Sequence, residues 1–235
     1  MRLAIISDIH GNLPALKAVL NDIDSRDIDQ IVCLGDLVDF APWPNEVIHL
    51  IRTSKIMTIM GNHDERIAFD LPIIPLSKHS EKETIAREKA INHSKNSVTA
   101  DNKAYLASLQ KSIIIQYENV KLHFTHASPE GIDEYLYEDE ESLEKRLLLV
   151  NTDFLLIGHT HLSYIKDFGN KKVINTGSVG RSKETDRKAA YSIVGVTPDS
   201  VTAEIVKVDY PIIETANAIY NSDIPDFYAD FLLFP

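Results

Sequence analysis

The first sixty residues alternate short apolar runs with segments of helical spacing. The apolar runs span Arg2 to Ser7, Gln30 to Leu34 and Lys55 to Met60. Between them, Leu13 to Ile23 and Asn45 to Arg52 carry apolar residues on one helical face. Strands that alternate with helices build a parallel sheet, because each crossover helix returns the chain to the same end of the sheet. The pattern therefore predicts an α/β fold that opens with parallel strands.

The remainder of the chain predicts helices followed by hairpins. Residues 81–109 are helical in pattern, with Thr99 as the cap of a second helix. Further apolar runs predict strands at Ser112–Tyr117, Val120–Thr125, Phe154–Ile157, Ser163–Phe168, Lys172–Asn175, Ala189–Val196 and Val201–Val208. Turns are expected at 118–119, 169–170 and 198–200, which makes this half largely antiparallel. Together the two halves predict two packed mixed β-sheets flanked by helices, in four layers.

The chain reads as a single domain over residues 1–235, because no linker rich in Pro, Gly or Ser and no internal repeat divides it. The expected catalytic core covers residues 1–208, and an extension over 209–235 is predicted to pack on that core. The extension begins with a helical pattern at Pro211–Tyr220 and ends in the aromatic stretch Asp226–Pro235. A homo-oligomer or partner contact through this tail is the alternative.

Composition restricts the class of protein. With 44% apolar residues among 235, the chain is long enough to bury a sizeable core, and no apolar run approaches the ~18 residues of a membrane span. The formal net charge of −11 disfavours binding to long nucleic acid or to an anionic membrane. Asp8 follows the first strand too soon for a secretory signal, and the single cysteine, Cys33, lies in an apolar run as a buried thiol would. These features predict a soluble, cytoplasmic protein.

Polar side chains follow the apolar runs at five places. The stretch Met60-Gly-Asn-His-Asp-Glu65 puts an amide, an imidazole and a carboxylate directly after one run, which a simple turn does not need. The other stretches are Asp8-Ile9-His10, Gly35-Asp36, His126 and Gly158-His159-Thr160-His161. Because ligands of open α/β sheets bind beyond the carboxyl ends of the strands, we expect all five stretches at one rim.

The pooled side chains predict a pair of metal ions. The candidate ligands are Asp8, His10, Asp36, Asn62, His126, His159 and His161. Imidazole with carboxylate suits Mn, Fe, Zn or Ni better than Ca or Mg, and seven ligands are too many for one catalytic ion. Pairs separated by one residue are expected to present both side chains together if the chain stays extended. Two ions about 3.5–4 Å apart would acidify the water between them and clamp a phosphate.

Each motif alone is weak evidence, because His-x-His and Asp-x-His occur by chance and Gly-Asn also makes turns. The argument for a site lies in their order, each after an apolar run. The other histidines, His49, His79, His93 and His123, lack such neighbours and are assigned to ordinary structure. The acidic run 138–141 is interpreted as a solvated helix start.

In their order and over most of the chain, these stretches resemble the motif set of the calcineurin-like metallophosphoesterase superfamily. Within it, segments 7–12, 127–129 and 175–180 look like a compact bacterial and archaeal phosphodiesterase-like branch. The resemblance implies one metal held by Asp8, His10 and His161, a second held by Asn62, His126 and His159, and Asp36 as the bridge between them. Manganese is the expected metal, with iron, zinc and nickel as alternatives.

The resemblance also implies catalytic roles for His63 and Asp64. His63 would stand beside the metals to stabilise developing charge or to protonate the leaving oxygen, a general-acid role typically worth about 10²–10⁴-fold. Asp64 would orient the imidazole of His63 and favour its protonated form. Protein phosphatases of the family usually have Glu at the position of Asp64, which weakens that activity as an expectation here.

Four residues are candidate substrate contacts: Asn12, Trp43, Arg66 and Arg181. Trp43, together with Phe40, lies in a loop that follows Asp36 closely, where an aromatic ring would stack on a base; core packing is the competing interpretation. The two arginines would contact phosphate, and a solvated arginine without such a role is the alternative.

The sequence therefore predicts a metal-dependent phosphodiesterase whose partner is a small phosphoester, with nucleotides among the candidates. A diadenosine polyphosphate or nucleotide hydrolase is one alternative, and a phosphomonoesterase such as a protein phosphatase is another. A metal-binding scaffold with little catalysis, or a sensor that binds a nucleotide and turns it over slowly, would belong to a different class. All seven ligand candidates and His63 are present, which favours an enzyme.

Overall fold

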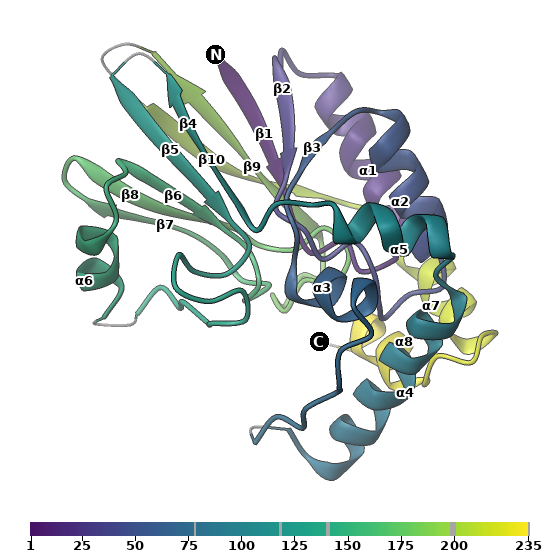
Figure 1. Cartoon of the computed structure of the whole chain (residues 1–235). Helices are drawn as coiled ribbons and strands as arrows, with labels where there is room; N and C mark the ends of the chain where they lie inside the picture. The colour runs from purple at the N-terminus through teal and green to yellow at the C-terminus, as the bar shows by residue number, and fades with distance from the viewer. Residues whose placement is uncertain (78, 118, 140–141, 198–200, 235) are drawn as a thin grey trace.

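Two five-stranded sheets pack against each other with helices on their outer sides (Figure 1). The computed structural model describes residues 1–77, 79–117, 119–139, 142–197 and 201–234. The first sheet has the order β10-β9-β1-β2-β3. Its strands are β1 (Arg2–Ile6), β2 (Gln30–Cys33), β3 (Met57–Thr58), β9 (Ala189–Val196) and β10 (Val201–Val208). The first three run parallel, as the alternation of strands and helices predicts, and β9 and β10 join them in antiparallel fashion.

The second sheet has the order β4-β5-β6-β8-β7. Its strands are β4 (Ser112–Tyr117), β5 (Val120–Thr125), β6 (Phe154–Ile157), β7 (Ser163–Phe168) and β8 (Lys171–Thr176). β4 pairs with β5, and β7 with β8, in antiparallel fashion, whereas β5, β6 and β8 run parallel. The prediction of a largely antiparallel second half is therefore wrong at the centre of this sheet. The long connection through α6 (Ser142–Leu149) returns the chain for a parallel pairing that short hairpins cannot make.

Alternation along β1 fills two separate cores. Leu3 and Ile5 point between the sheets, where Phe124 of the second sheet belongs to the same cluster of buried residues. Ala4 and Ile6 point to the opposite face and pack with the helices that cover the first sheet. Because successive side chains of a strand alternate between its two faces, an uninterrupted apolar run is what a strand buried on both faces requires.

The covering helices complete four layers. Helices α1 (Leu13–Asp24) and α2 (Pro44–Thr53) lie over the first sheet, and α6 lies over the second (Figure 1). The start of α1 is as predicted, with Pro14 in the first turn and the Asn12 side chain accepting a hydrogen bond from the backbone N–H of Ala15. Cys33 is fully buried in β2, and burial raises the pKa of its thiol, so the prediction of a buried thiol is confirmed.

The remaining helices are α3 (Asn62–Ala68), α4 (Glu81–Ser97), α5 (Ala100–Ala107), α7 (Ile212–Tyr220) and α8 (Phe227–Leu233). In Figure 1, α3, α4 and α8 lie beyond one end of the sheets. Tyr228 and Ala229 of α8 share a buried cluster with Phe40, from the loop after β2, and with Ala86 and Ala90 of α4. The C-terminal helices thus pack on the loop after β2 and on α4.

Two local predictions need correction. The predicted strand at 55–60 is only two residues long, because Lys55 has φ 53° and Met60 donates its backbone N–H to Gln110 instead of continuing the pairing with β2. Helix α3 follows at once and was not predicted. The predicted division of residues 81–109 at Thr99 is confirmed, since the Thr99 hydroxyl accepts the N–H of Asn102. Residues 118, 140–141 and 198–200, in two predicted turns and the acidic run, lie outside the described residues.

Among the described residues, no helix has the length and apolar character that crossing a membrane requires.

Candidate active site

The loops that follow β1, β2, β5 and β6 meet at one rim and form two groups of buried metal-ligating side chains. One group contains Asp8, His10 and His161, and the other contains Asp36, His126 and His159. Within each group the ligand atoms lie within 4.8 Å of one another. Each group takes residues from both sheets, so the rim predicted from the ends of the strands exists and the two sheets build it jointly.

Backbone carbonyls fix the orientation of all four imidazole rings. The Nδ1 atoms lie near carbonyl oxygens in three cases: His10 near Val38 at 2.9 Å, His126 near Leu34 at 2.9 Å, and His161 near Arg181 at 2.6 Å. In the fourth ring, Nε2 of His159 lies 3.1 Å from the Asp133 carbonyl oxygen. A carbonyl oxygen only accepts, so each of these ring nitrogens carries the proton and donates it. The other nitrogen of each ring is left to point into the site, as in histidines that bind metals.

His10 and His161 require a cation between them. Their Nε2 atoms lie 3.1 Å apart, and burial lowers the pKa of both rings, so both are neutral and two lone pairs face each other. Oδ1 of Asp8, which lacks a hydrogen-bond partner although it is buried, lies 3.2 Å from the same nitrogen of His161. Two imidazole nitrogens and a carboxylate oxygen that lack donors fit a divalent transition-metal ion.

In the second group, His126 and Asn62 likewise bring together atoms that a cation would stabilise. Nε2 of His126 lies 3.1 Å from Oδ1 of Asn62 and 3.4 Å from Oδ2 of Asp36, and both oxygens only accept. Burial alone would lower the pKa of His126, but the charge of Asp36 raises it to about 9. When no metal is present, a proton on His126 therefore supplies the positive charge at this position. Asn62 lies with this group, next to His126.

Asp36 stands between the two groups. Its Oδ2 is 3.4 Å from Nε2 of His126 and 3.7 Å from Nε2 of His10, one histidine from each group. Its Oδ1 accepts the backbone N–H of His63 at 2.8 Å, which fixes the carboxylate. The basic rings of His126 and His63 hold the pKa of Asp36 well below its usual value although burial opposes this, so the carboxylate is ionised.

Five of the ligands have a left-handed backbone. Their φ values are 54° for Asp8, 50° for His10, 57° for Asp36, 65° for His159 and 62° for His161. The expectation of an extended chain at these pairs is wrong. The backbone instead keeps hydrogen-bonding across the loops, as the N–H of His10 donates to the carbonyl of Asp36 at 2.9 Å. Such conformations are unfavourable for residues other than glycine, and they concentrate at functional sites.

Steric crowding explains why residue 61, at the start of the Gly61-Asn62-His63 stretch, is a glycine. A Cβ atom at Gly61 would collide with the carboxylate and the backbone nitrogen of Asp36. Only glycine lets the chain pass this close to Asp36 and then start α3 at Asn62, which turns both Asn62 and His63 toward the site.

Comparison with known sequences and structures agrees with this geometry. The sequence pattern of the calcineurin-like phosphoesterase superfamily domain matches residues 1–198. The chain belongs to this superfamily. The chain is 31% identical over 247 residues to an uncharacterized protein of Methanocaldococcus jannaschii, and the match covers 98% of the chain and 96% of that protein. It is 26% identical over 192 residues to serine/threonine-protein phosphatase 2 of Escherichia coli, covering 74% of the chain and 86% of that protein.

Solved structures show the same fold. A metallophosphoesterase from Sphaerobacter thermophilus superposes with a TM-score of 0.78 at 28% identity, covering 99% of this chain and 98% of that one. The two mixed sheets and the helices on either side of them are thus those of a metallophosphoesterase, as the resemblance of the motifs implies.

The candidate site contains a histidine–aspartate pair whose acid was not predicted. Nδ1 of His63 lies 2.5 Å from Oδ2 of Asp39, a fully buried residue three positions after Asp36. The prediction that Asp64 orients His63 is wrong, because the Asp64 carboxylate accepts three backbone N–H groups instead, from Asp36, Leu37 and Gly61. The sequence signal that could have identified Asp39 was a second aspartate three residues after Asp36, in the same loop.

A cavity of about 310 Å³ opens beside the metal-ligating groups. Its lining includes Asp36, His63 and the predicted Arg66 and Arg181. It also includes residues that sequence reasoning missed or assigned to ordinary structure: His79, Arg87, Tyr135, Lys183, Phe227, Tyr228 and Phe231. Three of these come from α8, so the C-terminal extension forms a wall of the cavity.

Two predicted substrate contacts lie elsewhere. Trp43 borders a different cavity, against α1 and Pro211. Asn12 is fully buried, and its amide is used within the fold: it donates to Gly180 and accepts from Ala15 and Thr215. Asn12 therefore ties α1 to the start of α7 and has no free group for a substrate. Phe40, which shares the loop with Trp43, does line the cavity.

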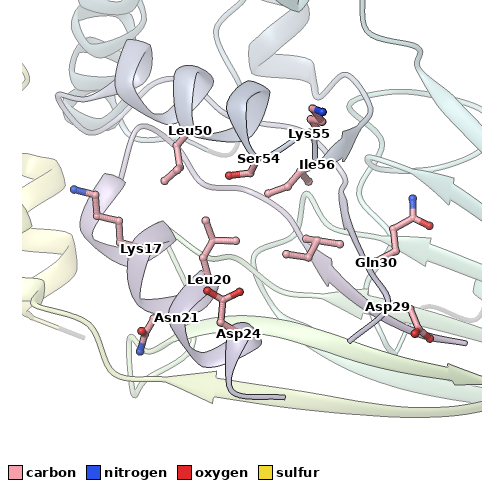
Figure 2. A pocket seen from close by; sticks show the side chains of 11 residues that line it. Lys17, Leu20, Asn21, Asp24, Asp29, Gln30, Leu50, Ser54, Lys55 and Ile56 are labelled. Carbon is pink, nitrogen blue, oxygen red and sulfur yellow. The ribbon is translucent and has the colours of Figure 1, made fainter. Parts of the chain in front are cut away.

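A larger groove, of about 610 Å³, lies between α1 and α2 at the start of β2 and lacks this chemistry. Figure 2 shows its lining, with Leu20, Leu50 and Ile56 among polar residues such as Lys17 and Asp24. None of its lining residues is a histidine or belongs to either metal-ligating group. The cavity beside His63 is therefore the candidate active site, although it is the smaller one.

Proposed function

We propose that this chain is a metal-dependent phosphodiesterase that uses a pair of divalent metal ions to hydrolyse small phosphoesters. The observation that carries the proposal is the pair of three-residue groups with Asp36 between them, at the edge of a cavity that contains His63. A lone metal site would not need a carboxylate within 3.7 Å of a histidine from each group. Two-metal sites of this kind are typical of phosphoester hydrolysis.

The donor atoms fit two transition-metal ions. Asp8, His10 and His161 would hold one, Asn62, His126 and His159 would hold the other, and Asp36 would contact both. When bound, the ions supply an acidified water molecule and positive charge for the phosphate oxygens. Oxygen and imidazole donors favour manganese, with iron, zinc and nickel as alternatives.

His63 and Asp39 supply the proton for the leaving group. The short contact between them holds the ring by Nδ1 and leaves its other edge toward the cavity. From this position the ring would donate a proton to the departing oxygen. No side chain needs to form a covalent bond to phosphorus in this scheme.

The size of the cavity supports a small substrate. At about 310 Å³ it lies at the lower end of ligand pockets, and Tyr228 and Phe231 of α8 form one of its walls. A phosphorylated protein would have to pass that wall, so we place a protein phosphatase, the activity named for the E. coli relative, below a small-molecule hydrolase. Aromatic and arginine side chains in the same lining favour a nucleotide or diadenosine polyphosphate as the second candidate substrate.

The test is hydrolysis of bis-p-nitrophenyl phosphate and of p-nitrophenyl phosphate by protein stripped of metal and resupplied with Mn²⁺. We expect turnover that depends on the metal, is faster on the diester, and falls sharply in Asp36→Asn and His63→Ala. Arg26→Gln, at a surface ion pair with Asp22, is the matched control. A protein that binds Mn²⁺ but hydrolyses neither ester nor a panel of nucleotides would be a scaffold or sensor instead.

A further inference from the structure

More basic than acidic side chains line the cavity beside the metal-ligating groups. Arg66, Arg87, Arg181 and Lys183 line it against three acids, which are Asp36, Glu83 and Asp133. Asp36 belongs to the metal-ligating groups, and Glu83 accepts hydrogen bonds from Ser80 at the start of α4. This excess occurs in a chain whose net charge is −11, so it is a local feature of the cavity.

None of the described acids forms an ion pair with Arg66, Arg87 or Arg181. The salt bridges of the described residues involve other basic side chains, and the hydrogen bond from Arg87 goes to the carbonyl of Ile74 at 3.0 Å. Nη1 of Arg66 and Nε of Arg181 are buried without a hydrogen-bond partner. Burying a cation without a counterion is unfavourable, so these groups gain most from a ligand that brings negative charge.

Arg66 and Arg181 are placed so that their guanidinium groups can bind an anion. Arg66 follows Asn62 by four residues on α3 and therefore lies about one turn, ~5.4 Å, along the helix on the same face. The carbonyl of Arg181 holds the ring of His161, and its guanidinium lies over Phe40 at 4.8 Å and Phe231 at 4.5 Å. Rings on the faces of a guanidinium leave its N–H groups, which lie in the plane, free to donate to an anion.

Arg87 adds a like charge to the same wall. It is buried on α4, and both burial and the nearby charge of Arg66 lower the pKa of its guanidinium. Arg66 and Arg87 repel each other, and neither is paired with an acid among the described residues. An anionic group that accepts hydrogen bonds from both would reduce this repulsion. Asp36, Asn62, His159 and His161 line the same cavity as these arginines, so one ligand could contact both sets of residues.

We infer that Arg66, Arg87 and Arg181 form a second anion site, and that the substrate is a small phosphoester with another anionic group, a phosphate or a carboxylate. This inference rests on the proposed function for the cleaved phosphate. The arginine site itself needs neither metal nor turnover. The scissile phosphate lies at the metal-ligating groups, and the second group lies against the three arginines.

The first experiment tests the site without metal. Calorimetric titration of metal-free protein with glycerol 3-phosphate is expected to show one binding site. The dissociation constant should rise at least about tenfold, equivalent to about 1.4 kcal/mol, in Arg66→Gln and in Arg181→Gln, and should stay unchanged in Arg26→Gln. Arg66→Lys keeps the charge but loses the paired N–H donors of the guanidinium. Its dissociation constant should therefore lie between those of wild type and Arg66→Gln. Equal binding by wild type and both glutamine variants would overturn the inference.

The second experiment tests for the additional anionic group. Mn²⁺-loaded His63→Ala protein, in which turnover is slow, is titrated with glycerol 3-phosphate, 3-phosphoglycerate and 2,3-bisphosphoglycerate. Tighter binding of only the bisphosphate identifies a phosphate, and a similar gain from 3-phosphoglycerate identifies a carboxylate. Equal binding of all three ligands would overturn the inference. Since both readouts are binding, a lack of phosphoesterase activity would count against the proposed function alone.

Discussion

Asp39 holds the imidazole of His63 by a contact of 2.5 Å between its Oδ2 and Nδ1 of the ring. Asp39 is fully buried and has φ 74°, so its carboxylate is aimed by a strained backbone in the loop after β2. His63 lines the cavity together with Asp36. His63 is thereby the side chain best placed to transfer a proton.

Asp39→Asn should slow hydrolysis most where the leaving group needs protonation. The amide replaces the charged partner of Nδ1 with a neutral one, which weakens the hold on the ring, and we expect kcat to fall by about 10²-fold or more on phenyl phosphate, within the range of a general acid. The loss should be much smaller on p-nitrophenyl phosphate, whose leaving group departs without a proton. Steady-state kinetics on both esters measures this. Equal losses on the two would contradict a general-acid role.

Asp64→Ala should instead weaken the fold. Its carboxylate accepts N–H groups from Asp36, Leu37 and Gly61, at 2.7, 2.8 and 3.0 Å, inside a fully buried loop. Leaving these donors without an acceptor should lower the free energy of unfolding by about 3 kcal/mol or more, measured by urea denaturation. Asp64→Asn keeps one acceptor oxygen and should lose less. A stable but inactive Asp64→Ala protein would argue that Asp64 acts on the chemistry directly.

Metal binding should release one proton near pH 7.5. His126 has a raised pKa of about 9, whereas burial lowers the pKa of His159 to about 3 and that of His10 and His161 below the usual value. Only His126 therefore carries a proton that a metal must displace. Calorimetry in two buffers of different ionisation enthalpy counts the protons, with His123→Gln as a control outside the site. A count of zero would show that His126 is neutral.

The same proton makes the stability of the metal-free protein depend on pH. The pKa of His126 in the folded protein, about 9, lies above the ordinary histidine value of 6.5. The protonated ring therefore stabilises the fold fully below pH 6.5, and this contribution disappears as the pH rises through 9. Thermal unfolding without metal should show that decline, and His126→Gln should remove it.

Tyr228→Ala should disturb the site from a distance. Tyr228 stacks on Phe40 at 4.6 Å between ring centroids, and Phe40 in turn contacts the rings of His10 and His63, each at 4.9 Å. Removing a buried ring of this size costs about 3–5 kcal/mol of folding free energy and should lower kcat by loosening His63. Phe234→Ala, on the same tail but 68% exposed, is the matched control and should change neither quantity.

The two groups of candidate metal ligands could be predicted to lie together because strand ends are a local signal. Each metal-ligating residue follows an apolar run in the sequence, and parallel strands bring such ends to one edge. Arg87 and Phe231 had no such signal, because packing across the chain brings α4 and α8 to the cavity. Asp39 lies in the loop after β2, but its contact with His63 depends on how that loop folds against α3. Asp64 was misassigned for a related reason: its position beside His63 in the sequence suggests contact, but α3 turns the two side chains in different directions.

Trp43 and Asn12 were predicted as substrate contacts, but neither lines the cavity. Trp43 shares a loop with Phe40, but the loop has a left-handed backbone at Asp39 and Phe40, with φ values of 74° and 70°, and only Phe40 lines the cavity. Such backbone conformations are not encoded by hydrophobic periodicity.

Because each metal-ligating group takes residues from both sheets, a bound ion would also act as a crosslink in the chain. His10 and His161 are 151 residues apart in sequence, and His126 and Asn62 are 64 apart. Tying such distant points together lowers the conformational entropy of the unfolded chain, by an amount that grows only slowly with loop length. The two sheets of the loaded protein should then unfold in one cooperative step, with the ions joining its N-terminal and C-terminal halves.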